Sequence, residues 1–371
     1  MKRLLIDINT IIPYYTEHYV TGIGRSTLEL VRSLSKIEEI PFKIILFSQN
    51  MRGVKAKEDF PFSYLHFYLP NRPFFKKLSN ILHLKSLFCK YDLLHIPSNT
   101  DDVENEKKVI YTIHDLAVCR YPQMWGVENN PLFYQQLRAS LHNCKAIITC
   151  SECSKQDIIA FAHIPQEKII SIPWGINRSI FHPISSPDFV IRLGLPRLYY
   201  FSASCNHPRK NLPVLLQAFK KYIENDGQGS LVLLNPIEAE LVGVENLIEN
   251  RRIIVCRRIS DMELAELYTF AHCSIIVSEY EGFGFPILES LACHTMVISS
   301  QNSSLKEVGG HICDYIEQIT PNIICDKLLF YDKIDKSDTL NVRETESHLK
   351  HFTWEKCALQ YMQFYKKQLG Y

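Results

Sequence analysis

Residues 278–289 read Ser-Glu-Tyr-Glu-Gly-Phe-Gly-Phe-Pro-Ile-Leu-Glu, and they follow an apolar run that has the character of a buried strand. Gly282 and Gly284 let the backbone approach a bound group closely. Pro286 is typical of the first turn of a helix, and a helix beginning there offers free N–H groups and the positive end of its dipole. The stretch therefore predicts an α/β fold with a ligand-binding loop between a strand and a helix.

Two carboxylates of this stretch are separated by seven residues. Glu281 lies at the predicted tip of the loop, and Glu289 lies in or just past the first turn of the predicted helix. In this arrangement one carboxylate can meet a sugar hydroxyl while the other meets a ribose. The spacing alone is equally compatible with an exposed loop acid and an ordinary acid near the start of a helix.

Outward from this stretch, short β-branched runs alternate with amphipathic helical patterns along the chain. This alternation predicts parallel sheets with helices on both faces. In the first half the predicted strands are residues 2–8, 42–47, 92–96, 109–113 and 146–150, and the predicted helices are 24–36, 74–90 and 131–143. In the second half the predicted strands are residues 198–204, 230–234, 252–256, 273–278 and 296–300, with helices from Asn211, Asp261 and Pro286.

A proline-marked stretch, residues 172–187, interrupts this alternation and predicts a linker. We therefore expect two doubly wound, Rossmann-like domains, residues 1–180 and 190–350, followed by a C-terminal helix in 351–371 that packs back on the first domain. Ligands of such sheets bind at the carboxyl ends of the strands. The cleft between the two halves is accordingly the expected site.

The composition excludes several classes of protein. The chain has 371 residues, with 41 Lys and Arg against 40 Asp and Glu, and this balance argues against a nucleic-acid partner. No apolar run approaches the roughly 20 residues that span a bilayer, and Asp7 interrupts the N-terminal apolar stretch too early for a signal peptide. We expect a soluble, cytoplasmic protein with reduced cysteines, in which Cys150 and Cys153 end a strand and begin a helix.

The segment 258–308, with Glu281 and Glu289 in their glycine-rich context, resembles the donor-binding half of retaining GT-B glycosyltransferases. These are the large "group 1", family 4-like enzymes that act on nucleotide sugars. Four further segments resemble motifs of that family in the same order along the chain. They are a glycine-rich loop at 21–25, a strand-end histidine motif at 112–122, a serine-rich helix start at 149–154 and the basic loop Pro-Arg-Lys-Asn-Leu at 208–212.

The resemblance implies roles for particular residues. Lys210, with Arg209, would neutralise the donor diphosphate, where a nearby helix start reinforces the positive charge. His114 would contact the transferred sugar, although a histidine beside Asp115 is also compatible with a structural hydrogen bond. The remaining implied contacts are Glu281 to the hexose, Glu289 to the ribose, Gly282, Phe283 and Gly284 to the donor, and Gly22, Gly24 and Arg25 to the diphosphate or the acceptor.

The chain departs from the family pattern at two places. The family often has an additional arginine several residues before the lysine, where this chain has Ser204 and its neighbours, so a second cation is absent or comes from elsewhere. Trp174-Gly175 stands where related proteins commonly have Asn-Gly, which puts the hinge and the donor contacts near it in doubt.

The glycine-rich loop at 21–25 is not a dinucleotide fingerprint, because Thr27 occupies the place of the third glycine.

Asp-x-Asp, the metal-binding motif of the other major glycosyltransferase fold, does not occur in the sequence. We therefore expect no metal and no cofactor, with the nucleotide sugar as co-substrate. The leaving group would be stabilised by Lys210, Arg209 and backbone amides.

The resemblance is strongest to enzymes of O-antigen and exopolysaccharide assembly, many of which are mannosyltransferases. It implies transfer of a hexose, with GDP-mannose as the expected donor, to a glycan or undecaprenyl-diphosphate-linked acceptor of a bacterial surface polysaccharide. Three alternatives stay open: a UDP-, GDP-fucose or dTDP-sugar donor, a nucleotide-sugar 2-epimerase of similar architecture, and a non-catalytic protein that binds sugar nucleotides.

Residues 71–88 combine basic and bulky apolar residues in a helical pattern. Such a stretch could lie on an anionic membrane, and a buried crossover helix with a basic outer edge is an equal alternative. The residues that favour peripheral contact with the inner membrane are Arg72, Lys76, Lys77 and Lys85 beside Phe74, Phe75 and Phe88.

Overall fold

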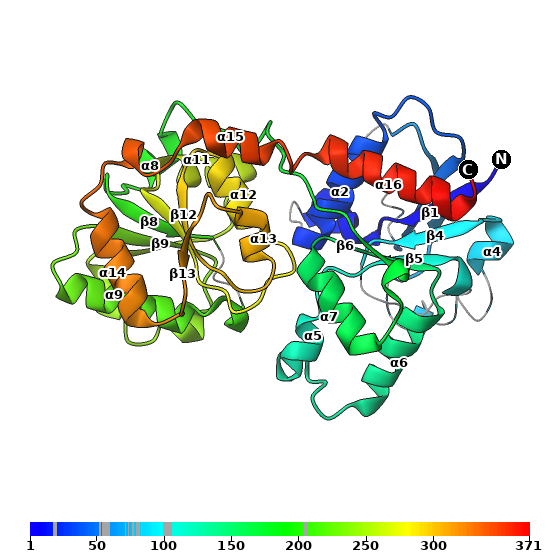
Figure 1. Cartoon of the computed structure of the whole chain (residues 1–371), viewed down its shortest axis with the longest axis horizontal. Coiled ribbons are helices and arrows are strands. Elements are labelled where there is room, and N and C mark those ends of the chain that lie inside the picture. The colour runs from blue at the N-terminus through cyan, green and yellow to red at the C-terminus, as the bar shows by residue number, and fades with distance from the viewer. Residues whose placement is uncertain are drawn as a thin grey trace. The chain divides into compact units, whose positions relative to one another are not determined.

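The structure is a computed structural model. It describes residues 1–17, 21–51, 53, 60–70, 72, 74–75, 78, 82, 84–98, 106–203 and 207–371. The chain divides into two compact units. The first comprises Met1–Gly175 and Trp354–Tyr371, and the second comprises Ile176–Thr353. Each is built on one parallel sheet (Figure 1).

The first unit contains a seven-stranded sheet in the order β3-β2-β1-β4-β5-β6-β7, with every described pair parallel. The strands are β1 Arg3–Asp7, β2 Lys43–Gln49, β3 Ser63–Phe67, β4 Leu93–Ile96, β5 Val109–Thr112, β6 Ala146–Thr149 and β7 Ile169–Ser171. Five of them confirm predicted strands. The sequence did not indicate β3 or β7, because β3 is a mostly half-buried edge strand and β7 has only three residues.

Helices cover both faces of this sheet. On one face, α6 and α7 contribute Leu137, Leu141, Ile158 and Ala162 to a core built on alternate strand residues. On the other, α2 packs against the C-terminal helix α16. The helices of the unit are α1 Ile12–Glu17, α2 Gly22–Leu34, α4 Leu84–Phe88, α5 Ala117–Arg120, α6 Pro131–Asn143, α7 Glu152–Ala162 and α16 Trp354–Leu369, with short 3₁₀ turns at Asn9–Ile11, Glu106–Lys108, Pro122–Trp125 and Gln166–Lys168.

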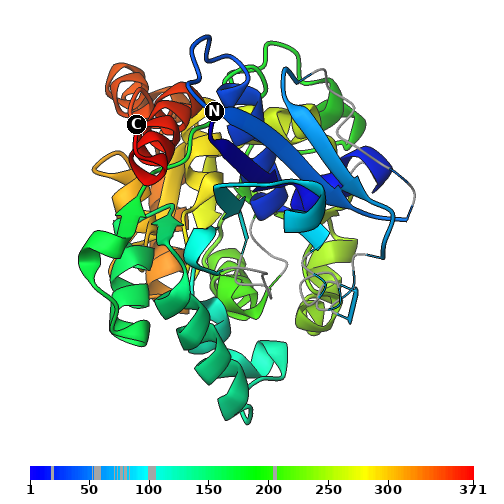
Figure 2. The same ribbon diagram turned by 90° about the vertical axis from the view of Figure 1, so that its right-hand side faces the viewer.

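The final helix completes the first unit although it follows the second in sequence. Its buried residues recur at helical spacing, from Trp354 through Tyr361 and Tyr365 to Leu369. The two ends of the chain lie side by side (Figure 2), and the Lys2 amide donates a hydrogen bond to the Tyr371 hydroxyl at 3.4 Å.

The second unit contains a six-stranded parallel sheet in the order β10-β9-β8-β11-β12-β13. Helices α9 and α14 cover one face, and α11 and α12 cover the other (Figure 1). The strands are β8 Tyr199–Ser202, β9 Ser230–Leu234, β10 Ile253–Cys256, β11 Cys273–Ile276, β12 Met296–Ser300 and β13 Asp314–Ile316. The helices are α8 Asp188–Arg192, α9 Leu212–Glu224, α10 Glu245–Glu249, α11 Asp261–Phe270, α12 Phe285–Ala292, α13 Leu305–Gly309, α14 Pro321–Tyr331 and α15 Val342–Leu349, with 3₁₀ turns at Pro208–Lys210, Glu238–Leu241 and Lys336–Asp338.

One expectation from the sequence was wrong. The predicted helix 74–90 is not continuous, because Leu82 lies in a turn and α4 covers only Leu84–Phe88. The predicted linker, residues 172–187, contains the junction of the two units between Gly175 and Ile176. Its later part packs within the second unit, since Phe181 is buried against Tyr268 with ring centroids 6.3 Å apart, and the Ile184 amide donates to Thr269 Oγ1 at 3.2 Å.

Sheet order places a potential site in the second unit. The strand order reverses between β8 and β11, so the connections that leave these two strands diverge to opposite sides. Open α/β sheets bind ligands at such a switch point, beyond the carboxyl ends of the strands. Among the helices in the described part of the chain, none is both long and apolar enough to cross a bilayer.

Candidate active site

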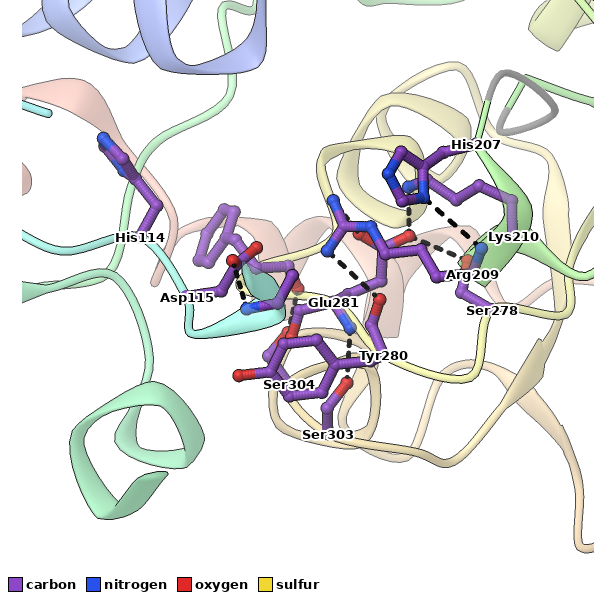
Figure 3. Close-up of polar contacts among 12 residues, drawn as sticks. His114, Asp115, His207, Arg209, Lys210, Ser278, Tyr280, Glu281, Ser303 and Ser304 are labelled. Atoms are coloured by element: carbon purple, nitrogen blue, oxygen red, sulfur yellow. Dashed lines mark hydrogen bonds and ion pairs between the residues drawn. The ribbon is translucent and has the colours of Figure 1, made fainter. Parts of the chain in front are cut away.

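Two loops meet at the switch point of the second sheet, one after β8 and the other after β11. The Glu279 amide of the second loop donates to the Arg209 carbonyl of the first at 2.9 Å. The Lys210 ammonium donates to Glu281 Oε1, and Arg209 Nη2 lies 3.9 Å from Glu281 Oε2 (Figure 3). The structure thus brings together the basic pair and the first carboxylate that the sequence singled out.

The basic loop has a local structure that differs slightly from the prediction. Pro208–Lys210 form a 3₁₀ turn capped by His207, whose Nδ1 accepts from the Arg209 amide at 3.4 Å. Asn211 then adopts a left-handed conformation with φ of 59°, and α9 begins at Leu212 rather than at Asn211. Lys210 therefore lies in a hydrogen-bonded turn, separated from the helix by Asn211, and its side chain is only 11% exposed.

Glu281 is held from several sides. Ser278 Oγ donates to Glu281 Oε1 at 2.7 Å, and the Glu281 amide donates to Ser303 Oγ at 2.7 Å. Ser304 Oγ donates to the Glu281 carbonyl at 2.8 Å (Figure 3). Each bond fixes a different atom of the residue, so the backbone and the carboxylate are both oriented before any ligand arrives.

The surroundings of Glu281 keep its carboxylate charged. Burial alone would raise the pKa of this side chain, which is buried in the folded unit. The positive charges of Lys210 and Arg209, and hydrogen bonds from Lys210 and Ser278, outweigh burial and hold the pKa below its ordinary value. The cluster is therefore a buried ion pair in which the Glu281 carboxylate stays charged at neutral pH.

Glycine is required at the start of α12. Gly284 caps the helix with φ of 112°, a conformation that side chains rarely tolerate, and a Cβ there would lie 2.9 Å from Leu305 Cδ2. Gly282 is buried beside it. The Phe283 ring packs against Phe285 and Phe352 at centroid distances of 5.4 and 6.2 Å, and the Phe283 carbonyl accepts from Ser304 Oγ at 2.8 Å.

Glu289 occupies the second turn of α12, since the helix begins at Phe285. Its carboxylate is buried, and the Tyr268 hydroxyl of α11 donates to Glu289 Oε2 at 3.0 Å. The second carboxylate is thus oriented by a tyrosine that the sequence reading did not identify.

His114 directly follows Ile113 after β5 in the first unit, and its imidazole is buried. Nε2 donates to the Pro97 carbonyl at 3.1 Å, and the ring contacts Trp174 at a centroid distance of 5.1 Å. Burial lowers the pKa of His114 to about 4, so the ring is neutral at pH 7. With Nε2 carrying the hydrogen, Nδ1 is a hydrogen-bond acceptor, and it has no partner among the described residues.

The histidine motif and the serine-rich helix start of the first unit are joined by hydrogen bonds. Ser154 Oγ, in the first turn of α7, donates to the His114 carbonyl at 2.9 Å, and the Cys150 thiol donates to the same oxygen at 3.3 Å. The serine-rich helix start therefore holds the histidine loop in place. Cys150 directly follows β6 and Cys153 lies in the first turn of α7, as the sequence predicted.

The glycine-rich loop begins helix α2, as predicted. Thr21 caps the helix by accepting from the Gly24 amide at 3.2 Å, and α2 starts at Gly22. The space that a Cβ at Gly22 would enter is open. Arg25 lies in the first turn and is half exposed, so the helix start can receive an anionic group.

The sequence reading missed the serines and the tyrosine that orient the two carboxylates. Ser303 and Ser304 immediately precede α13, and paired serines before a short helix were the available signal. Within the described ranges, no group of three or more His, Cys, Asp and Glu side chains is arranged to hold a metal ion. Ser204, at the position of the family's additional arginine, lies outside the described residues.

The fold and these motifs define a class of enzyme. The family model described as "Glycosyl transferases group 1" matches residues 194–312, and the model "Glycosyltransferase Family 4" matches residues 20–179. The chain therefore belongs to the group 1, family 4-like glycosyltransferases and has the GT-B fold of two Rossmann-like domains.

Particular relatives are similar along the whole chain. O-antigen chain mannosyltransferase B of Escherichia coli is 27% identical over 367 residues, covering 94% of this chain and 96% of that protein. Sucrose-phosphate synthase from Thermosynechococcus elongatus has the same fold, with a TM-score of 0.76, 18% identity and full coverage of both chains. Anabaena Alr3699/HepE in complex with UDP and glucose matches with a TM-score of 0.71, 15% identity and 99% coverage of each chain.

Proposed function

We propose that this glycosyltransferase moves a hexose, with retention of anomeric configuration, from a nucleotide sugar to a lipid-linked or oligosaccharide acceptor of a bacterial surface polysaccharide. GDP-mannose is the proposed donor. The donor and the acceptor class rest on the similarity to an O-antigen chain mannosyltransferase over 94% of the chain. The observation that carries the proposal is the buried cluster of Lys210, Arg209 and Glu281 at the switch point of the second sheet.

The cluster fits the departure of a nucleoside diphosphate. Negative charge develops on the bridging oxygen as the bond to the sugar breaks, and preorganised cations stabilise that charge. Lys210 and Arg209 supply the positive charge. The start of α12 adds backbone N–H groups and the positive end of a helix dipole. Without donor, the Lys210 ammonium is paired with Glu281. An arriving diphosphate offers it a second anion, which frees the carboxylate of Glu281 to bind hexose hydroxyls.

Each of the remaining site residues contacts a different part of the donor or the acceptor in this proposal. Glu289, oriented by Tyr268, binds the ribose hydroxyls as an acceptor of hydrogen bonds. His114 contributes a neutral imidazole for the transferred sugar, and the start of α2 at Gly22, Gly24 and Arg25 receives the diphosphate or the acceptor. No divalent metal takes part in this proposal.

A panel of nucleotide sugars tests the donor. A ligand that binds only the folded protein stabilises it by about 2.7 kcal/mol at 100 times its dissociation constant. GDP-mannose is expected to raise the melting temperature more than GDP-fucose, UDP-glucose or a dTDP-sugar at equal concentration. A larger shift with another member would replace GDP-mannose as donor. Incubation of the bound donor without acceptor, followed by product analysis, separates a transferase from a 2-epimerase, because only the epimerase converts the free nucleotide sugar into its isomer.

We also propose that the protein works in the cytoplasm, in peripheral contact with the inner face of an anionic membrane. The support is the segment between β3 and β4, in which Phe74, Leu87 and Phe88 are 70, 71 and 67% exposed and Arg72 is exposed. Lys85 does not take part, contrary to the sequence-based expectation, because it is buried with its ammonium 5.3 Å from the centroid of the Phe47 ring. Lys76 and Lys77 lie outside the described residues.

The Leu87→Glu/Phe88→Glu double variant is expected to lose binding to vesicles that contain anionic lipid, because it removes apolar area and adds negative charge at one surface. Leu359→Glu is the matched control, since Leu359 is 53% exposed on α16 of the same unit. Co-sedimentation at low salt measures both. If the unmodified protein does not sediment with these vesicles, there is no membrane contact.

A further inference from the structure

A chain of buried hydrogen bonds runs behind His114 from the C-terminal helix to β5. The Tyr365 hydroxyl lies 2.7 Å from His95 Nδ1, and His95 Nε2 lies 2.8 Å from Thr112 Oγ1. Thr112 Oγ1 in turn lies 3.4 Å from the Tyr361 hydroxyl. All of these side chains are buried in the first unit, although the two tyrosines are about 250 residues or more away in sequence.

The chain ends at a small pocket that His114 shares. Thr112, His114, Trp174 and Tyr361 line this pocket together with Ser26 and Thr27 of α2. Its volume is about 10 Å³, which is room for roughly one water. The imidazole of His114 is 6% exposed, and its Nδ1 acceptor is without a partner among the described residues. A buried acceptor without a donor costs free energy, and one hydrogen-bond donor in the pocket would remove that cost.

Counting hydrogens along the chain leaves two possible directions. A neutral histidine has one donor nitrogen and one acceptor nitrogen, and burial, with the nearby His114, lowers the pKa of His95 to about 3, which keeps it neutral. In one direction Thr112 donates to His95 and Tyr361 donates to Thr112, so the pocket receives no hydrogen from Tyr361. In the other, Tyr365 donates to His95, His95 donates through Nε2 to Thr112, and Thr112 donates to Tyr361.

Only the second direction leaves the Tyr361 hydrogen for the pocket, where it orients a water whose own hydrogen reaches the His114 Nδ1 acceptor. The Trp174 indole also hydrogen-bonds Tyr361, and an indole N–H can only donate. The Tyr361 oxygen then accepts twice, and its own hydrogen is left to point at the pocket. Burial raises the pKa of Tyr361, so the hydroxyl keeps that hydrogen. A water in the pocket could accept from Tyr361, donate to His114 Nδ1 and reach the hydroxyl oxygens on α2.

We propose that Tyr361 and Thr112 are positioning residues for His114: through one buried water they extend a one-way hydrogen-bond chain from Tyr365 and His95 to the His114 imidazole and fix its orientation and tautomer. The C-terminal helix thereby serves the site and not only the stability of the first unit. The consequence for catalysis rests on the proposed function of His114, whereas the hydrogen-bond direction does not.

Nitrogen NMR of the ¹⁵N-histidine-labelled protein without substrate tests the direction. His95 is expected to carry its hydrogen on Nε2, and His114 likewise, with the His114 Nδ1 resonance shifted as a hydrogen-bonded acceptor. In Tyr361→Phe that resonance should move toward the position of an imidazole nitrogen without a hydrogen bond. A hydrogen on His95 Nδ1, or an unchanged His114 signal in Tyr361→Phe, would overturn the proposal whatever the enzyme does.

The second arm measures release of nucleoside diphosphate from the donor in the presence of acceptor. Tyr361→Phe and Thr112→Val should each lower turnover about fivefold, the loss expected for one neutral hydrogen bond, and Thr112→Ser should restore it because it keeps the hydroxyl. Tyr199→Phe is the matched control, since the Tyr199 hydroxyl donates to Leu267 at 2.8 Å in the second unit. Equal turnover in Thr112→Val and Thr112→Ser would overturn the positioning role. No turnover in any form, with the expected NMR signals, would instead count against the proposed function.

Discussion

Replacement of Lys210 by alanine is expected to lower turnover about a hundred- to a thousandfold, the usual loss of about 2.7–4 kcal/mol for one preorganised group that stabilises developing negative charge. Lys210 lies in a hydrogen-bonded turn and its ammonium donates to Glu281, so the charge is positioned before the donor binds. The variant should remain folded, because two backbone hydrogen bonds maintain the turn, one from the Lys210 amide to the His207 carbonyl and one from the Asn211 amide to the Pro208 carbonyl.

Lys221→Ala is the matched control for Lys210→Ala. Lys221 lies on α9, the helix that follows Lys210, and its ammonium donates to Asn322 at the surface, so its loss should leave turnover unchanged. Chelation by EDTA should also leave the unmodified enzyme nearly unaffected, because the proposal stabilises the leaving group without a metal. Loss of activity in EDTA that magnesium or manganese restores would refute this account of the leaving group.

The two carboxylates are expected to fail in different ways when they are replaced. Glu281→Ala should mainly lower kcat, because the contact of Glu281 with the hexose changes as the sugar gains oxocarbenium character. Glu289→Ala should mainly weaken donor binding, because a ribose contact is equal in the ground state and the transition state. Initial rates over a range of donor concentrations, together with donor binding by calorimetry, separate the two effects.

Conservative variants sharpen this comparison. Tyr268→Phe removes the hydroxyl that orients Glu289 and should resemble Glu289→Ala with a smaller effect. Glu281→Gln keeps the shape of the side chain and an acceptor for Ser278 but removes the negative charge beside Lys210, so it should keep the fold and still lower kcat. Kinetics like those of the unmodified enzyme in both Glu281→Ala and Glu289→Ala would show that the assignment is wrong.

Much of the fold and of the site followed from local patterns. Ten predicted strands appear in the two sheets, because buried parallel strands are continuous apolar runs that a sequence displays directly. The sequence predicted that Lys210 and Glu281 lie at the ligand-binding edge of one sheet, because both follow strands of that sheet, but it did not predict the ion pair between them. Gly284 was predictable for a similar reason, because a helix start after a tight loop needs its conformational freedom.

Other features depend on contacts between distant segments, and no local pattern encodes them. Ser303 and Ser304 orient Glu281 across more than twenty residues, and Tyr361 completes the surroundings of Thr112 from 249 residues away. Lys85 illustrates the same limit, because its spacing fits an exposed helix edge and only packing against Phe47 buries it. The sequence by itself indicated the candidate groups for the chemistry and the strand ends on which they stand. The tertiary structure alone decided which side chains hold those groups in place, because a hydrogen bond depends on distance in space and not on separation along the chain.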